Sequence, residues 1–150
     1  MINNYVKMIC GMLQLPMPQV FYSDNALQPG QHARLTPDGK QLYLRKLKAA
    51  SLDQLFAASS ELRREWQRRT DNARYYGEYK SSEELTLREF SMQPAEVDAN
   101  AFAAVVVSAF FGVEPVFDEY PGVTRSRIDS RIAEIRREEF PQLAAMKLPH

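Results

Sequence analysis

A cysteine can act as a nucleophile, and the chain has one. Its single cysteine, Cys10, lies in an apolar stretch with helical spacing, which is typical of a small core residue. A nucleophilic thiol needs a base partner, and nothing in the sequence brings His32 or His150 close to Cys10. We therefore interpret Cys10 as part of the core.

A cluster of arginines interleaved with tyrosines is a second candidate for function. Its members are Arg63, Arg64, Arg68, Arg69, Arg74, Tyr75, Tyr76 and Tyr79. Such a cluster can bind single-stranded nucleic acid by phosphate contact and base stacking, with Arg68, Tyr75 and Tyr76 as the binding residues. Neighbouring acidic residues dilute the charge, so a solvated, salt-bridged helix face is favoured and nucleic-acid binding is the alternative.

The elements that must position these residues follow from periodicity and turn signals. We expect a helix over residues 2–14, a short strand over 20–22, and a hairpin with strands 33–35 and 41–45 joined by Thr36-Pro37-Asp38-Gly39-Lys40. Helices are expected over 53–74, 83–90, 94–111 and 123–140. The order predicts an α+β fold: an N-terminal helix and a small antiparallel sheet packed on a bundle of three or four helices.

The segment Ser60-Glu61-Leu62-Arg63-Arg64, followed by Trp66-Gln67, resembles the active-site helix of ImmA/IrrE-type zinc metallopeptidases. Those helices carry His-Glu-Leu-Arg-His and then an aromatic residue and Gln. By this resemblance, Ser60 and Arg64 occupy the positions of the two zinc-binding histidines, and Glu61 occupies that of the general base.

A second motif resembles the family's third-ligand helix. The sequence Glu96-Val97-Asp98-Ala99-Asn100-Ala101-Phe102-Ala103 places Glu96 at the position of the third zinc ligand. The resemblance covers about residues 1–112, and it implies a single zincin-like domain over 1–150 with an added C-terminal helix at 123–140.

The departures from the family pattern predict that zinc hydrolysis is lost. Serine is a poor zinc ligand at neutral pH, and arginine stays protonated and cannot ligate a metal. We therefore expect no catalytic residues, no metal and no cofactor. An alternative is a hydrolase whose metal is held by Glu61, Glu96 and Asp98, because carboxylates alone suit Mg²⁺, Ca²⁺ or Mn²⁺.

The same resemblance suggests a replacement for the metal. The second histidine and the third ligand converge on zinc in the family, so Arg64 and Glu96 could form a direct bidentate ion pair, with a further hydrogen bond from Ser60. A solvent-facing Arg64 is the other interpretation.

The resemblance also implies a function without catalysis. The hairpin strand Gln41, Leu42, Tyr43, Leu44 and Arg45 matches the family's substrate-binding edge, where a peptide would add as a strand. Related proteins often come from phages and mobile elements, so we expect recognition of a protein or peptide partner, in regulation or inhibition.

Composition bounds these expectations. The 150 residues carry 19 basic and 19 acidic side chains and a formal net charge of zero, which argues against a general nucleic-acid or membrane-surface binder. Lys7 and Gln14 interrupt the first apolar stretch, and the apolar run from residue 99 to 113 is shorter than a bilayer span. We expect a cytoplasmic protein.

Overall fold

The computed structural model describes residues 2–144, and the chain divides into two compact units, residues 1–66 and 67–150. The boundary falls inside helix α2 (Leu52–Tyr76), between Trp66 and Gln67. The expected single domain stays a prediction.

Helix α1 (Ile2–Leu13) opens the first unit and confirms the amphipathic helix expected there. Its buried side chains include Val6, Ile9 and Cys10, the last with 3% of its surface exposed, so Cys10 is a core residue as predicted. The helix ends at Gln14, whose φ of 56° is left-handed. The Leu15 N–H then donates to the Cys10 carbonyl at 2.9 Å, which satisfies an end carbonyl of the helix.

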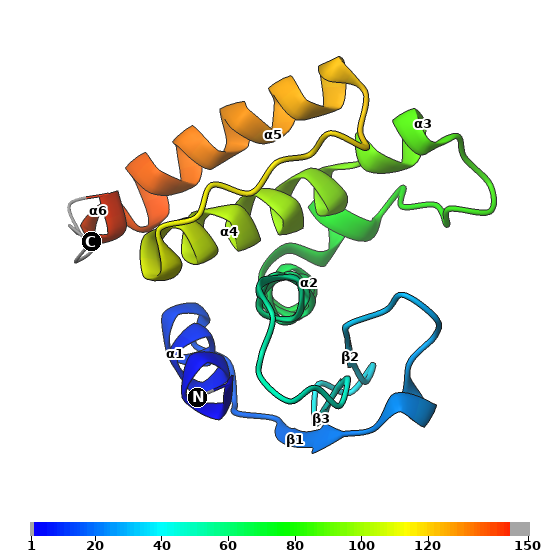
Figure 1. Ribbon diagram of the computed structural model, residues 1–150. Coiled ribbons are helices and arrows are strands. Elements are labelled where there is room, and N and C mark those ends of the chain that lie inside the picture. The colour runs from blue at the N-terminus through cyan, green and yellow to red at the C-terminus, as the bar shows by residue number, and fades with distance from the viewer. Residues whose placement is uncertain (1, 145–150) are drawn as a thin grey trace. The chain divides into compact units, whose positions relative to one another are not determined.

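The three strands, β1 (Gln19–Tyr22), β2 (Ala33–Leu35) and β3 (Gln41–Leu44), form one sheet in the order β1-β3-β2 (Figure 1). The hairpin β2–β3 is antiparallel, as expected, but β1 pairs with β3 in parallel. The predicted antiparallel sheet is therefore wrong in one of its two pairings. The chain reverses between β1 and β2 and again at the hairpin turn, so β3 regains the direction of β1, and the segment 23–40 is long enough for this crossover.

Local turn chemistry fixes the hairpin. Gly39 has a φ of 74°, and the Asp38 carboxylate accepts hydrogen bonds from Thr36 Oγ1 at 2.6 Å and from the Lys40 N–H at 3.0 Å. These bonds to the charged form lower the pKa of Asp38, the Thr36 hydroxyl having the largest effect. Leu42 and Leu44 are fully buried on one face of β3, and Tyr43 lies on the other, as the alternation predicts.

Helix α2 begins after Ser51, whose hydroxyl accepts from the Gln54 N–H at 3.1 Å. In the first unit it buries Leu55, Ala58 and Leu62. Further along, Asp71 leaves helical geometry, with φ −158° and ψ 71°, and kinks the helix.

The second unit contains α3 (Leu87–Ser91), α4 (Pro94–Phe111), α5 (Gly122–Glu134), a π-helical turn η2 (Ile135–Glu139) and α6 (Pro141–Ala144). Helix α4 has the predicted bounds, because Pro94 suits its first turn and Gly112 takes the left-handed position after its end, with a φ of 68°. Helices α4 and α5 lie side by side (Figure 1). The single helix expected over 123–140 is instead α5 followed by η2, and Ile128 and Ile135 are fully buried.

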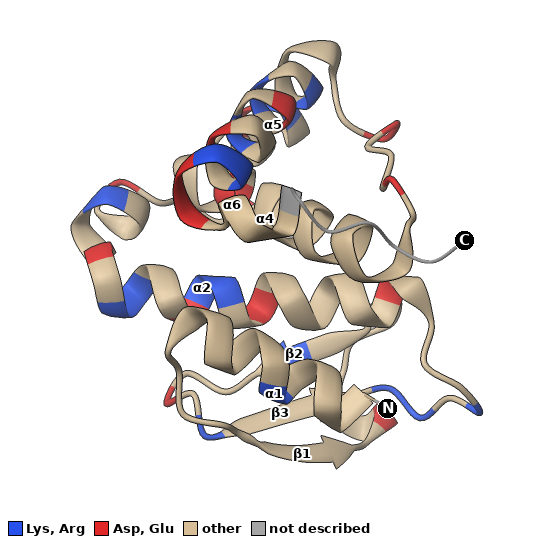
Figure 2. Cartoon of the chain, turned by 90° about the vertical axis from the view of Figure 1, so that its left-hand side faces the viewer, with Lys and Arg blue, Asp and Glu red and all other residues tan. Residues whose placement is uncertain are grey.

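Within residues 2–144, α4 is the one helix long and apolar enough to cross a bilayer, and 72% of it is buried inside the molecule. Charged residues of both signs mark α5, whereas α4 carries few (Figure 2). A buried core helix meets the same length and composition criteria as a membrane span.

Candidate functional site

The helix segment that resembles a zinc site lies in the first unit, on α2. Ser60 is 8% exposed, and its Oγ is buried and has no hydrogen-bond partner within the described part of the chain. Arg64 is half-buried, one turn further along the same face. If the motif resemblance holds, a neutral hydroxyl and a guanidinium occupy the two histidine positions.

Helix α2 follows the hairpin along its length. The Gln54 side-chain amide donates to the Arg45 carbonyl at 2.8 Å, and the Leu35 N–H approaches Glu61 Oε2 at 3.5 Å. Further along, a Cβ added at Gly39 would lie 3.1 Å from the carboxylate carbon of Glu65. The Glu61 side chain, which the resemblance assigns to the general-base position, is directed at the backbone of β2.

The strand predicted to bind a peptide is the middle strand of the sheet. Each residue of β3 has a register partner on β1, from Gln41 to Leu44, and β2 pairs with its other side. Arg45 follows the strand and is held by hydrogen bonds to the Gln31 and Gln28 carbonyls. Because both of its edges are occupied, strand addition on 41–45 is not available, and that prediction is wrong.

The two edge strands of the sheet are β2 and β1, and they differ in how far their outer backbone groups are covered. On β2, Ala33 and Leu35 are 2% and 6% exposed, so its backbone is covered. On β1, Gln19 donates to the Lys40 carbonyl at 2.8 Å and Ser23 to the Leu44 carbonyl at 2.9 Å. In a parallel pair alternate residues face the partner, so the N–H and C=O groups of Val20 and Tyr22 face outward.

The sheet face opposite the leucines carries an aromatic ladder. The Phe21 and Tyr43 rings stack with their centroids 5.6 Å apart, and the Arg34 guanidinium lies 5.1 Å from the Tyr43 centroid. These three side chains come from β1, β3 and β2 respectively and are half-buried. The row ends at Phe21, beside the open edge of β1.

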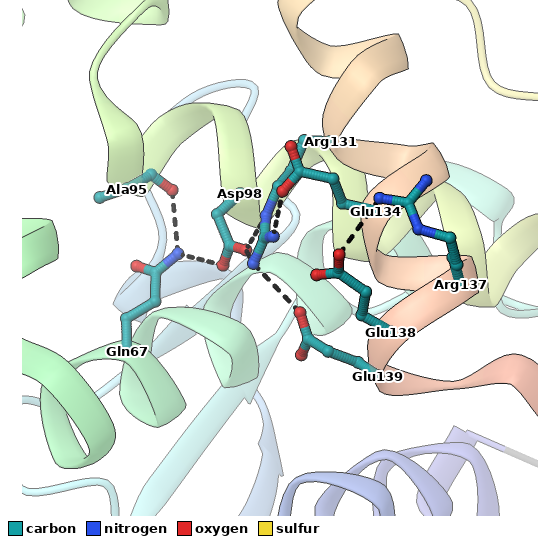
Figure 3. A network of polar contacts seen from close by, with 8 residues as sticks. All are labelled: Gln67, Ala95, Asp98, Arg131, Glu134, Arg137, Glu138 and Glu139. Atoms are coloured by element: carbon teal, nitrogen blue, oxygen red, sulfur yellow. Dashed lines mark hydrogen bonds and ion pairs between the residues drawn. The ribbon is translucent and has the colours of Figure 1, made fainter.

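The carboxylates of the second motif lie in the other unit, on the first turn of α4, and both are buried. Glu96 is 5% exposed and accepts a hydrogen bond from the Tyr79 hydroxyl at 2.6 Å. Asp98 Oδ2 accepts from the Gln67 side-chain amide at 2.8 Å, and Asp98 Oδ1 accepts from Arg131 Nε and Nη2 at 2.9 and 2.8 Å (Figure 3). Asp98 is therefore paired with a cation supplied by α5.

Arg131 is the centre of a wider network. Its Nη1 contacts Glu134 at 3.0 Å, and its Nη2 contacts Glu139, in the π-helical turn, at 3.1 Å (Figure 3). Burial by itself would lower the pKa of Arg131, but the charge and hydrogen bonds of Asp98 outweigh that effect, so the pKa of Arg131 is raised. The guanidinium is a fixed positive charge.

The sequence analysis missed Arg131, Tyr79 and Gln67 as partners of this motif. A usable signal exists for Arg131, which lies three residues after Ile128 and four before Ile135, on the buried stripe of its helix. An arginine in such a stripe requires a buried acid.

The predicted ion pair joins residues of different units, Arg64 in the first and Glu96 in the second, and stays a prediction. Among residues 2–144, no three His, Cys, Asp or Glu side chains form a group that could hold a metal ion. In the alternative carboxylate set, Asp98 already has its charge matched by Arg131.

The arginine–tyrosine cluster is largely engaged within the chain. Arg63 is fully buried, with its guanidinium 3.6 Å from the Trp66 ring centroid, and Arg68 lies 5.7 Å from that of Tyr76. Tyr75 is 3% exposed, so its ring has no open face for a stacked base, which removes it from the predicted binding residues. Tyr76 is half-buried and donates its hydroxyl to Gln67 at 2.7 Å.

No family model, curated protein or solved structure matches the chain. The resemblance to ImmA/IrrE-type metallopeptidases thus rests on the two motifs and on the order of the elements.

Proposed function

We propose that this chain is a catalytically inactive metallopeptidase-like domain that recognises an extended segment of a protein partner. The proposal is supported by Ser60 and Arg64, which the motif resemblance assigns to the two histidine positions. A neutral hydroxyl is a poor zinc ligand, a protonated guanidinium cannot ligate a metal, and a guanidinium at this position repels a divalent cation. The partner is then held rather than hydrolysed, which suits a regulatory or inhibitory role in the cytoplasm.

The environment of Glu61 supports the same proposal. A general base must reach a metal-bound water, whereas one oxygen of this carboxylate faces the Leu35 N–H, at 3.5 Å. The carboxylate covers a backbone donor of β2 instead. This arrangement removes β2 as a peptide-binding edge and leaves β1.

The peptide would add to β1, where the outward N–H and C=O groups of Val20 and Tyr22 continue the ladder. Strand addition uses main-chain hydrogen bonds for affinity and alternate side chains for selectivity. A residue of the added strand beside Phe21 would extend the ladder Phe21–Tyr43–Arg34, so an aromatic or β-branched residue is favoured there.

The test is a substitution that removes one edge donor. Peptides selected from a displayed library against the full chain are measured for affinity to Tyr22→Pro and to the matched control Tyr22→Thr. Both variants lose the aromatic ring of Tyr22, a residue that is 47% exposed, but only the proline variant loses the outward N–H. We expect Tyr22→Pro to bind about tenfold more weakly than Tyr22→Thr, the effect of one lost hydrogen bond with its acceptor left unpaired.

Equal affinities for the two variants would contradict binding at β1. Failure to select any saturable peptide ligand would contradict peptide recognition itself. Circular dichroism of each variant establishes that the comparison is made between folded proteins.

A further inference from the structure

The second unit contains a pocket that the proposed peptide surface does not use. Its volume is about 260 Å³, and its walls come from the end of α2, the first turn of α4 and one face of α5. Three guanidinium groups line it: Arg74 from α2, and Arg127 and Arg131 from α5. Arg127 and Arg131 are four residues apart, so both lie on the same side of α5.

Two of these cations have no counter-charge. Arg131 is matched by Asp98, and Glu134, the other acid of the pocket wall, is held by Arg131 at 3.0 Å. Arg74 and Arg127 are exposed, and neither forms an ion pair with any residue of the described chain. The lining carries three arginines and two acids, Asp98 and Glu134, so its formal charge is +1, and the two arginines without an ion pair among the described residues come from α2 and from α5.

The pocket also has an apolar side. Pro94 and Val97 form this apolar wall from α4, and the buried Tyr75 ring is covered by the Arg74 guanidinium, 5.0 Å from the ring centroid. A second cavity of about 410 Å³ shares Arg74, Tyr75 and Pro94 with the first. The two together have room for an anionic group and a small organic group attached to it.

We propose that this pocket binds a phosphate monoester carried on a small aromatic or apolar group. A phosphate monoester has nearly two negative charges at neutral pH and three terminal oxygens. It can accept hydrogen bonds from Arg74, from Arg127 and from the Ser130 hydroxyl on the same wall at once. A carboxylate has two oxygens and is satisfied by a single guanidinium, so it uses only one of the two walls.

The experiment titrates phenyl phosphate into the full chain and follows binding by calorimetry. We expect saturable binding that weakens about tenfold or more in Arg74→Gln and in Arg127→Gln, because each substitution removes a charge-assisted hydrogen bond. The matched control is Arg125→Gln, an exposed arginine of α5 outside the pocket, which should bind like the unchanged protein.

Two further probes separate the parts of the proposal. Phenol should not bind, since it lacks the anion, and benzoate should bind more weakly than phenyl phosphate. No saturable binding of phenyl phosphate, or equal weakening in all three variants, would overturn the site. Equal affinity for benzoate would overturn its assignment to phosphate.

Discussion

Arg131 donates two hydrogen bonds to one carboxylate oxygen of Asp98, at 2.9 and 2.8 Å, and these two side chains are 13% and 2% exposed. The pair joins α5 to α4 within the second unit. It supplies a buried cation to a motif that the resemblance associates with a metal ligand. The source of that cation is a helix beyond the region that the resemblance covers.

This pair should dominate the stability of the second unit. Removing one member leaves an uncompensated buried charge, so Arg131→Met should lower the free energy of unfolding by about 3–5 kcal/mol. Urea denaturation measures it. The control is Arg137→Met, which breaks an exposed pair with Glu138 and should cost about 1 kcal/mol or less. Equal effects of the two substitutions would show that Arg131 contributes no more than a surface ion pair.

Alkaline pH should destabilise the first unit. Burial raises the pKa of Tyr5 from its ordinary value of 10.0 to about 12, and the hydrogen bond from Tyr5 to Ser59 opposes this with a smaller effect. Burial also raises the pKa of Cys10, from 9.0 to about 11. The unfolded chain then loses these protons at lower pH than the folded chain. Stability should fall as pH rises above about 9, by up to about 1.4 kcal/mol per pH unit for each group inside its own window.

Urea unfolding at a series of pH values measures this slope. Tyr5→Phe cannot ionise at that position, so its stability should decline less steeply above pH 10. A decline identical to that of the unchanged protein would contradict the assignment to Tyr5.

Two glycines should respond to alanine with opposite signs. Gly39 has a φ of 74° and a Cβ there would meet Glu65 at 3.1 Å, so Gly39→Ala should destabilise by roughly 1–3 kcal/mol. Gly11 lies inside α1 with no atom within 4 Å of an added Cβ, and Gly11→Ala should stabilise by about 0.5–1 kcal/mol. Thermal unfolding of both variants checks the prediction, and a stabilised Gly39→Ala would refute the turn geometry.

The proposed pair of Arg64 and Glu96 predicts non-additive substitutions. In a double-mutant cycle, Arg64→Ala and Glu96→Ala should couple by about 1 kcal/mol or more if the guanidinium binds this carboxylate. Tyr79→Phe with Glu96→Ala is the reference cycle, because that hydrogen bond is 2.6 Å long. Coupling in the reference cycle together with additivity for Arg64 would contradict the pair of Arg64 and Glu96.

Local signals predicted much of the fold. Pro94 and Gly112 fixed both ends of α4, and the turn Thr36–Lys40 fixed the hairpin and its register, because each feature depends on neighbours in sequence. The partner of β1 was missed, since nothing in a four-residue strand states which of two hairpin strands it will join. The π-helical turn and the kink at Asp71 were also missed.

In the candidate site, too, local features were predicted and long-range contacts were not. The motif resemblance singled out Ser60, Glu61, Glu96 and Asp98 as candidates, but it did not indicate which residues contact them. Gln67, Tyr79 and Arg131 reach the second motif through folding over separations of 17 to 33 residues, and long-range pairs of this kind leave only indirect marks in one sequence. The open edge at β1 likewise follows from strand order, which the sequence did not give.

The metal content of the purified, tag-free protein tests the central claim most directly. After incubation with zinc and desalting, elemental analysis should find far less than one zinc per chain, because Ser60 and Arg64 cannot replace two imidazoles. Stoichiometric zinc, lost on Glu96→Gln, would contradict the inactive-site account and return peptide hydrolysis as the function to test.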